Sequence, residues 1–462
     1  MNEDEQYQKI HFEVLNRVIP KKVEIEKLQN EFENFKRKVA QILLKNNIQA
    51  TIEAGGSFSR DTWLSGNSDI DIFVKMPQDS ETTPEELVKV VQKNIKLKWE
   101  KRHANHPYLF TNYNEIDIEI VPCYELELGD KIRSAVDRSP LHREFVTKNL
   151  PIGANDEVRL LKQFMKGVGT YGAEIKVHGF SGYLTELLTI YYQGNFLNVL
   201  RNAKEFRTKE IYFHENQFIA KKRFENDAMI VIDPTDEFRN VASPIQEDTL
   251  AKFIAAAEYY LHKPSLHFFF PKEIEISAQK IKELQNNPLK IVTLVHKKSE
   301  VAADVLWGQI RKFEKGLANY LIQNGFQVLF IDSLTIEDKI ITVIVTITES
   351  IPPVEWKEGP PIENDNQIIF LEKYHKNNSV IHGPIIEDNR WKVLVKRNLC
   401  KIEEIIQDAL DKKVIALPSY LNLKIKELQI LSKEETIAMF QNNQEVMVFI
   451  YKALLNKPDY LW

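Results

Sequence analysis

The chain has very little cysteine and no long apolar run. Only two of its 462 residues are cysteines, Cys123 and Cys400, which are too few for a disulfide framework or a zinc ribbon. This scarcity is typical of a protein from a reducing compartment. No stretch reaches the roughly 18 uncharged apolar residues that a membrane span needs. The nearest, 253–271, is interrupted by Glu258, Lys263 and two histidines, so we expect no association with a membrane.

The first residues also lack the features of a targeting segment. The N-terminal sequence MNEDEQYQKIHFEV is polar and acidic, with neither the apolar core of a signal peptide nor the Arg-rich, acid-poor pattern of a transit peptide. A cytoplasmic location is the resulting expectation. The sequence contains no Walker A motif, so nucleotide binding by a P-loop is not supported.

What is present is the composition of a folded, multi-domain protein. Hydrophobic residues make up 43% and charged residues 27% of the chain, and the length corresponds to about three domains of roughly 150 residues. The net charge of −5 argues mildly against a nucleic-acid partner, because phosphates require positive surface. Two local segments, 159–178 and 201–223, are nevertheless basic. Taken singly, each is better explained by a solvated helix face.

Hydrophobic periodicity predicts an α+β organisation. Apolar residues at three- and four-residue steps predict helices in the first region over 4–18, 22–46 and 84–98. Runs of β-branched residues predict strands over 49–54, 69–75, 106–111 and 115–121. The pattern from 157 to about 261 is mainly helical. It is followed by strands at 289–296, 326–333 and 338–347 around a helix at 303–324. The proline-rich stretch 350–383 is expected to be a loop between sub-domains.

Asp69 and Asp71 form the most informative pair in the chain. They lie two residues apart on a predicted strand whose alternate residues, Ile70 and Ile72, face the other way. Both carboxylates therefore leave one face, about 6.6 Å apart along the backbone. Such a pair can bind one divalent cation and share a second, the arrangement used for phosphoryl or nucleotidyl transfer. A D-x-D pair is also common on solvated strand faces, so it does not establish a site by itself.

A glycine-rich turn precedes the pair. Gly55, Gly56 and Ser57 stand at a predicted strand-to-helix turn, and Asp69 follows Ser57 by twelve positions. Glycines let the backbone approach a phosphate, which helix-start amides and the Ser57 hydroxyl can hold. Arg60 lies three residues further on, where one phosphate could meet both side chains. The turn and the carboxylate pair, in this order, indicate a metal-dependent nucleotide site.

The order of these motifs resembles that of the DNA polymerase β-like nucleotidyltransferases and, among them, the archaeal, class I CCA-adding enzymes. The resemblance is close over about the first 270 residues. It rests on eight segments: GGSFSRDTW (55–63), HPY (106–108), IVPCY (120–124), SAVDRSPLH (134–142), VRLLKQFMK (158–166), YGAEIKVHGFSGYLTELL (171–188), DPTDEFRNVAS (233–243) and PSLHFFFP (264–271).

The resemblance implies both a fold and a reaction. The fold is a polymerase β-like head with a mixed sheet over 1–142, a helix-rich neck over 143–265 that completes the nucleotide pocket, and an α/β, RRM-like body with a C-terminal tail over 266–462 that binds tRNA. The reaction is templateless addition of C, C and A to the 3′ end of tRNA, with CTP, ATP and two Mg²⁺ ions. The tRNA is held at its acceptor stem and 3′ end; a homodimer is left open.

The resemblance also assigns residues. Asp69 and Asp71 match the paired metal ligands, and the third carboxylate falls on Glu119, where similar enzymes carry Asp. Asp117, two residues earlier on the predicted strand, remains an alternative. Arg239 matches the arginine that reads the incoming base; without the resemblance it would be a surface arginine paired with Asp236 or Glu237. The positions that match triphosphate- and sugar-binding residues are Gly56, Ser57, Arg60, His106, Lys162 and Tyr171.

Three other functions remain open from the sequence. A poly(A) polymerase would share the chemistry but use ATP alone. A non-catalytic RNA-binding protein derived from this family would be expected to have lost the metal carboxylates, and both aspartates are present. An antibiotic nucleotidyltransferase would not need the long segment beyond residue 270.

Overall fold

The chain folds into two compact units. The computed structural model describes residues 3–67, 69–103, 107–130, 132–214, 223–415, 417 and 427–462. One unit comprises 1–272 together with 458–462, and the other comprises 273–457. The division predicted at 142/143 lies inside the first unit and remains a prediction. None of the helices in the described ranges is long and apolar enough to cross a membrane.

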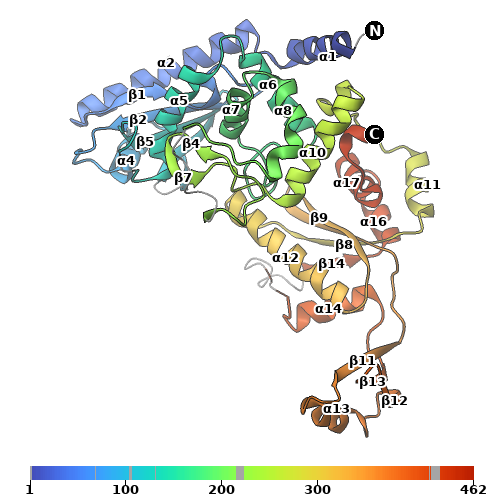
Figure 1. The fold of residues 1–462 in the computed structure, drawn as a ribbon. Helices are drawn as coiled ribbons and strands as arrows, with labels where there is room; N and C mark the ends of the chain where they lie inside the picture. The colour runs from blue at the N-terminus through green and yellow to red at the C-terminus, as the bar shows by residue number, and fades with distance from the viewer. Residues whose placement is uncertain are drawn as a thin grey trace. The chain divides into compact units, whose positions relative to one another are not determined.

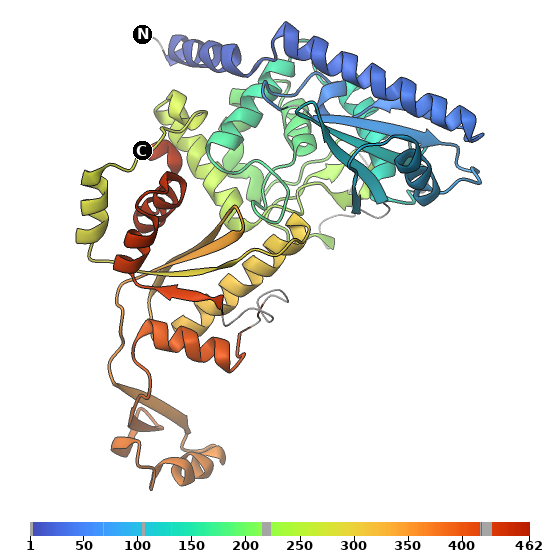
Figure 2. The same cartoon turned by 180° about the vertical axis from the view of Figure 1, so that it is seen from behind.

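The first unit begins with four helices and a five-stranded sheet. The helices are α1 (Glu3–Val18), α2 (Lys22–Lys45), the short α3 (Gly56–Ser59) and α4 (Pro84–Asn94). The strands are β1 (Thr51–Ala54), β2 (Asp69–Met76), β3 (Glu100–His103), β4 (Pro107–Tyr113) and β5 (Ile116–Tyr124), in the order β1-β2-β5-β4-β3. Only β2 and β5 pair in parallel; the other neighbours are antiparallel. Figures 1 and 2 show α2 running along this mixed sheet.

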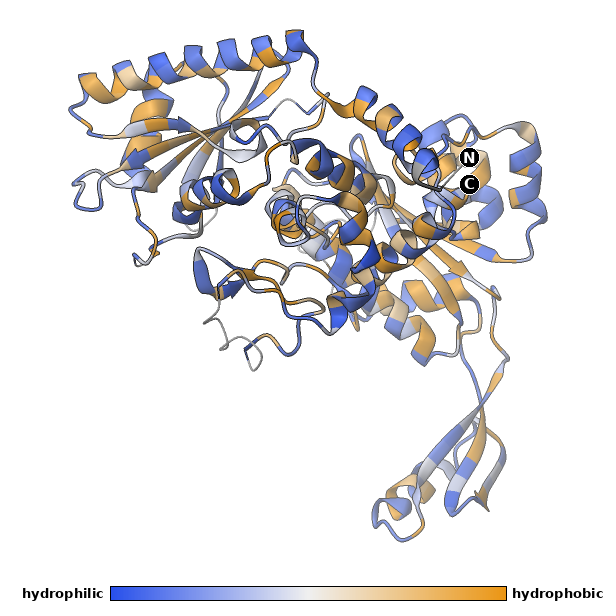
Figure 3. Cartoon of the chain, turned by 45° about the horizontal axis from the view of Figure 1, so that its top comes forward, coloured by the Kyte–Doolittle hydropathy of each residue, from blue (hydrophilic) through white to orange (hydrophobic). Residues whose placement is uncertain are grey.

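The sheet has one buried face and one polar face. Ile70, Ile72, Ile118 and Ile120 are buried in the core that α2 and α4 cover. Figure 3 shows hydrophobic and hydrophilic bands alternating along α2, the pattern of a helix that buries one stripe. Because side chains alternate along a strand, the residues between these isoleucines face the opposite side. The predicted strands over 69–75 and 115–121 are confirmed. The helix predicted over 84–98 ends at Asn94, and β3 follows it.

The helix-rich part of the same unit has its own aromatic core. Phe164, Phe196, Phe253 and Tyr260 are buried there, with ring contacts among them. Helix α1 packs with this core rather than with the sheet. The elements are α5 (Arg138–Asn149), α6 (Asn155–Gly167), α7 (Gly182–Tyr191), α8 (Phe196–Arg201), β6 (Ile232–Asp233), β7 (Asp236–Asn240) and α10 (Glu247–His262). The mainly helical interpretation of this region is confirmed.

The second unit contains the expected β-α-β-β order. Its elements are α11 (Ala278–Asn286), β8 (Lys290–Lys297), α12 (Ala303–Gln323), β9 (Val328–Ile336), β10 (Lys339–Thr346), α14 (Ile402–Asp411), β14 (Gln429–Leu431), α16 (Lys433–Phe440) and α17 (Gln444–Leu455). Its antiparallel sheet has the order β14-β8-β10-β9. This sheet agrees with the α+β class expected from the sequence.

The expectation of a loop over 350–383 is wrong. The segment contains β11 (Val354–Pro361), α13 (Asn366–Tyr374) and the start of β12 (Val380–Glu387), which form a three-stranded sheet with β13 (Arg390–Lys396) in the order β11-β13-β12. The prolines of this segment were the reason for the wrong prediction. Strand β11 is an edge strand with a register irregularity between Glu358 and Pro361, and both features tolerate proline.

Candidate active site

The predicted metal carboxylates lie together on the polar face of the five-stranded sheet. The parallel register of β2 and β5 places Asp69 opposite Asp117 and Asp71 opposite Glu119. Burial, followed by repulsion from Asp69, raises the pKa of Asp71 to about 6. Burial, followed by repulsion from Asp71, raises the pKa of Glu119 to about 7. The three carboxylates therefore form one electrostatically coupled group.

The glycine turn packs directly against Asp71. Gly55 N–H donates to the Asp71 carbonyl at 2.8 Å, and Gly56 adopts a φ of +58°. A Cβ on Gly56 would lie only 1.9 Å from Asp71 Oδ2. Residue 56 must therefore be glycine for two reasons, its left-handed backbone and its approach to a carboxylate.

A cavity of about 140 Å³ opens between the turn and the helical region. Its lining residues are Gly56, Arg60, Asp71, Phe73, Ser139, His142 and Tyr183. Pockets for drug-sized ligands occupy roughly 300–1,000 Å³. This cavity can therefore enclose a phosphate group but not a whole nucleotide.

The chemistry of these carboxylates suits a divalent cation. Asp69, Asp71 and Glu119 offer the hard oxygen ligands that Mg²⁺ prefers. Burial first, and then repulsion from neighbouring carboxylates, raise their pKa values, and a bound cation would offset that repulsion. Within the described ranges, no three His, Cys, Asp or Glu side chains are already arranged around a metal position. Glu119 is instead paired with Arg102, whose Nη1 donates to Glu119 Oε1 at 3.2 Å.

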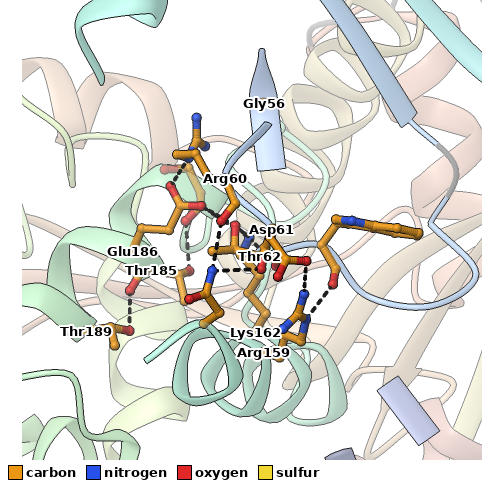
Figure 4. A network of polar contacts seen from close by, with 12 residues as sticks. Gly56, Arg60, Asp61, Thr62, Arg159, Lys162, Thr185, Glu186 and Thr189 are labelled. Carbon is orange, nitrogen blue, oxygen red and sulfur yellow. Dashed lines mark hydrogen bonds and ion pairs between the residues drawn. The ribbon is translucent and has the colours of Figure 1, made fainter. Parts of the chain in front are cut away.

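Arg60 and Lys162 converge on the buried carboxylate of Glu186 on α7 (Figure 4). Arg60 Nε lies 2.9 Å from Glu186 Oε2, and Lys162 Nζ lies 3.6 Å from Glu186 Oε1. Lys162 also donates to the carbonyl and the hydroxyl of Thr62, at 2.9 and 3.1 Å. The Thr62 hydroxyl donates in turn to Glu186. Lys162 is therefore held by protein partners, whereas Arg60 also lines the cavity.

Arg239 belongs to a second cluster, built around Asp233. The fully buried Asp233 carboxylate accepts from Arg239 Nη1 at 2.7 Å and lies 2.9 Å from His142 Nε2. The His142 ring stacks on Tyr183, with centroids 3.8 Å apart. Burial alone would raise the pKa of Asp233, but the His142 hydrogen bond and the Arg239 charge bring this pKa below its ordinary value. The partner of Arg239 is thus Asp233, and Asp236 pairs with Arg138 instead.

Two further predicted nucleotide-binding residues lie near these clusters. Ser57 is half-buried within the α3 turn. Tyr171 is half-buried on a short bridge to Phe180, and a Cβ on Gly182 would lie 3.0 Å from its hydroxyl. His106 lies outside the described residues, as do Lys221 and Lys222 of the second basic segment.

Sequence reasoning missed five residues of these two clusters: Thr62, His142, Tyr183, Glu186 and Asp233. Each lies inside a quoted motif, yet no spacing rule distinguishes it from its neighbours. Glu186 in particular looks like one polar residue in an apolar helix. Only its full burial against two cations reveals it.

Comparison with known families matches three parts of the chain. Residues 36–142 match a nucleotidyltransferase domain, 156–270 the second domain of tRNA nucleotidyltransferases, and 289–433 the C-terminal domain of CCA-adding enzymes. Among solved structures, that of E. coli MS115-1 CdnC with ATP aligns with a TM-score of 0.43 and 18% identity, over 56% of this chain and 94% of that chain. A score this low carries no further argument.

Relatives match along most of their length. The CCA-adding enzyme of Pyrobaculum aerophilum is 35% identical over 86% of this chain and 91% of its own. That of Sulfurisphaera tokodaii is 37% identical over 87% of this chain and 92% of its own. The nucleotidyltransferase match over 36–142 includes the glycine turn and the paired carboxylates, the match over 156–270 includes the Glu186 helix, and the match over 289–433 lies in the second unit. On this evidence the chain belongs to the family of CCA-adding enzymes.

Proposed function

We propose that this protein is a tRNA nucleotidyltransferase that adds C, C and A to the 3′ end of tRNA from CTP and ATP. In each step the terminal ribose oxygen of the RNA attacks the α-phosphorus of the nucleotide. A new P–O bond forms, the bond to pyrophosphate breaks, and the hydroxyl proton is released. Its membership of the CCA-adding enzymes supports this function. We infer that the tRNA is held at its acceptor stem and 3′ end, because the reacting hydroxyl lies at that end.

The geometric observation that carries the proposal is the register of Asp71 with Glu119 beside the Gly56 turn. Asp69, Asp71 and Glu119 would hold two Mg²⁺ ions. When bound, such ions lower the pKa of the attacking hydroxyl and stabilise the leaving pyrophosphate. The three carboxylates bring the reacting groups to the polar face of the sheet, and the buried isoleucines behind them keep that face rigid.

The cavity beside this carboxylate group would receive a phosphate of the triphosphate. Arg60 lines it and supplies guanidinium donors, and His142, on α5, contributes its ring to the lining. Ser57 and the backbone of the Gly56 turn would complete the phosphate contacts. Lys162 and Tyr171 would act from behind this cavity rather than within it, because Lys162 is bound to Thr62 and Glu186.

Arg239 would select the base. Cytosine and adenine present hydrogen-bond acceptors where uracil and guanine present a ring N–H, and a guanidinium has only donors to offer. Asp233 occupies one Nη of Arg239 and leaves the other donors of this half-buried side chain available. Fixed donors would therefore accept C and A and reject U and G.

The test is incorporation by the purified full-length chain. A tRNA lacking its 3′ CCA is incubated with Mg²⁺ and labelled CTP or ATP. We expect two C and one A to be added, with no label from UTP or GTP and no extension beyond A. Long A tails made from ATP alone would contradict the proposal, as would failure to incorporate CTP.

A further inference from the structure

We propose that Glu186 is a positioning residue for nucleotide binding: it holds Arg60, and with it the glycine turn, in the orientation that receives the triphosphate. This inference rests on the proposed function of the cavity that Arg60 lines. No part of the predicted site included Glu186. It comes from α7, whereas Arg60 and Thr62 come from the segment that follows α3. It therefore joins two parts of the unit that are more than a hundred residues apart.

The burial of Glu186 requires a compensating charge. Its side chain has no exposed surface, and those of Lys162 and Arg60 are only 3% and 9% exposed. A buried carboxylate without a partner is costly. Burial alone would raise the pKa of Glu186, but the charges of Arg60 and Lys162 bring it below its ordinary value. The carboxylate is therefore ionised and acts as the counter-ion of both cations.

One carboxylate cannot neutralise two cations. Arg60, Lys162 and Glu186 together carry one net positive charge; Asp71, which lines the cavity with Arg60, also interacts with that guanidinium, and its carboxylate is one that the proposed Mg²⁺ ions would neutralise. Lys162 uses its donors on Thr62 and Glu186, so the excess charge is presented by Arg60, which lines the cavity. A phosphate group would supply the missing negative charge. The network thus prepares an anion site, with Glu186 fixing the Nε side of Arg60 and leaving both Nη groups for the ligand.

The Arg60–Glu186 pair is close but not ideal as a hydrogen bond. The two atoms are 2.9 Å apart, yet neither Arg60 Nε nor Glu186 Oε2 has a well-directed hydrogen-bond partner among the described residues. The pair is therefore held mainly by charge, and it depends on the surrounding groups for its orientation. The Thr62 hydroxyl, which bridges Lys162 and Glu186, is the other support.

The experiment compares Glu186→Gln with Glu157→Gln in the full-length protein. Glu157, on α6, also accepts a hydrogen bond in the helical region, from Phe196 N–H at 2.7 Å, but lies outside the cavity and the network. We expect Glu186→Gln to raise KM for CTP and ATP at least tenfold, with a smaller change in kcat and a tRNA Kd within twofold of wild type. Arg60 would bind ground and transition states alike, so its displacement appears in KM. Glu157→Gln should leave KM unchanged.

A double-mutant cycle tests whether Glu186 acts through Arg60. If it does, adding Glu186→Gln to Arg60→Lys should raise KM less than twofold further, because the orientation that Glu186 provides is already lost. Additive effects would overturn the proposal. So would an unchanged or lower KM in Glu186→Gln, even with a reduced Tm, since a merely structural carboxylate would change Tm alone.

Two measurements keep the test independent of folding and of turnover. If Glu186→Gln does not fold, Thr62→Val, which removes the bridging hydroxyl at nearly constant volume, should raise KM several-fold; an unchanged KM there would overturn the proposal. In an equilibrium titration, the Kd for CTP should rise by the same factor as KM. A wild-type protein that binds CTP and does not extend tRNA would refute the proposed function, while the titration would still decide the role of Glu186.

Discussion

Asp71 on β2 and Glu119 on β5 are direct partners in the one parallel strand pair of the five-stranded sheet. Parallel pairing places partner side chains on the same face, so the two carboxylates approach one another from segments 48 positions apart in the chain. Asp69 lies on the same face, beside Asp117. Whether Glu119 or Asp117 is the third carboxylate of the site depends on this register, and mutagenesis can distinguish the two.

Glu119→Gln should reduce nucleotide transfer far more than Asp117→Asn. Glu119 is opposite Asp71, the carboxylate that packs against the Gly56 turn, whereas Asp117 accepts from Asn112 at 2.7 Å and lines a separate cavity of about 260 Å³ with Asp69. The loss in Glu119→Gln should exceed the roughly 10–100-fold cost of removing an outer-shell partner of a metal. Single-turnover CMP incorporation measures both variants, with Glu119→Asp expected to stay active. The reverse order would assign the role to Asp117.

Asp69→Asn and Asp71→Asn should each abolish transfer and leave tRNA affinity within about twofold of wild type. Removing either carboxylate leaves too few ligands for a cation pair, whereas tRNA binding depends mainly on phosphate contacts elsewhere. Incorporation and filter binding give the two readouts. Asp79→Asn, at an exposed position in the turn after β2, is the matched control and should remain active. Substantial transfer by either site variant would remove these aspartates from the metal site.

Arg239→Ala should lose CTP and ATP incorporation more than tRNA affinity, and it should relax the exclusion of UTP in the activity that remains. A well-placed contact to a base edge is worth about 1–3 kcal/mol of discrimination. Asp233→Asn should shift selectivity in the same direction, because Asp233 orients both Arg239 and His142. Competition between CTP and UTP measures the ratio of their incorporation rates. The control is Arg207→Ala, at an exposed arginine paired with Glu247, which should keep the wild-type selectivity. Unchanged selectivity in Arg239→Ala would exclude Arg239 from base choice.

His11 should make the first unit less stable in mild acid. Burial against Tyr260, Phe196 and Phe269 lowers the pKa of His11 from 6.5 to about 4. The unfolded state then binds a proton more readily than the folded state, so the free energy of unfolding falls as pH drops from 6.5 to about 4. At about 1.4 kcal/mol per pKa unit, the loss is roughly 3 kcal/mol.

Denaturant unfolding between pH 4 and pH 7 measures this effect. His11→Phe should fit the aromatic surroundings and flatten the dependence, whereas substitution of the exposed His267 by Gln should leave it unchanged. Equal pH slopes for wild type and His11→Phe would show that His11 does not contribute.

The sequence by itself determined the local parts of this protein. The alternation of Ile70 and Ile72 with Asp69 and Asp71 fixes a strand with one apolar and one acidic face, because side chains alternate at a period of two. The glycine turn is equally local, because the run Gly55, Gly56 and Ser57 predicts it, whereas the approach of Gly56 to Asp71 comes from the fold. The proline-rich segment 350–383 shows the limit of local reasoning, because an edge strand and a loop share the same composition.

Only the tertiary structure decided how the charged residues are partnered. Lys162 looks like an exposed helix lysine in the sequence, and the fold buries it against Thr62 and Glu186. Arg239 has two acidic neighbours in sequence, and the fold pairs it with Asp233 instead. Charge pairing acts through space and strengthens as water is excluded, so it depends on which distant segments the core brings together. That information is absent from any local pattern of residues.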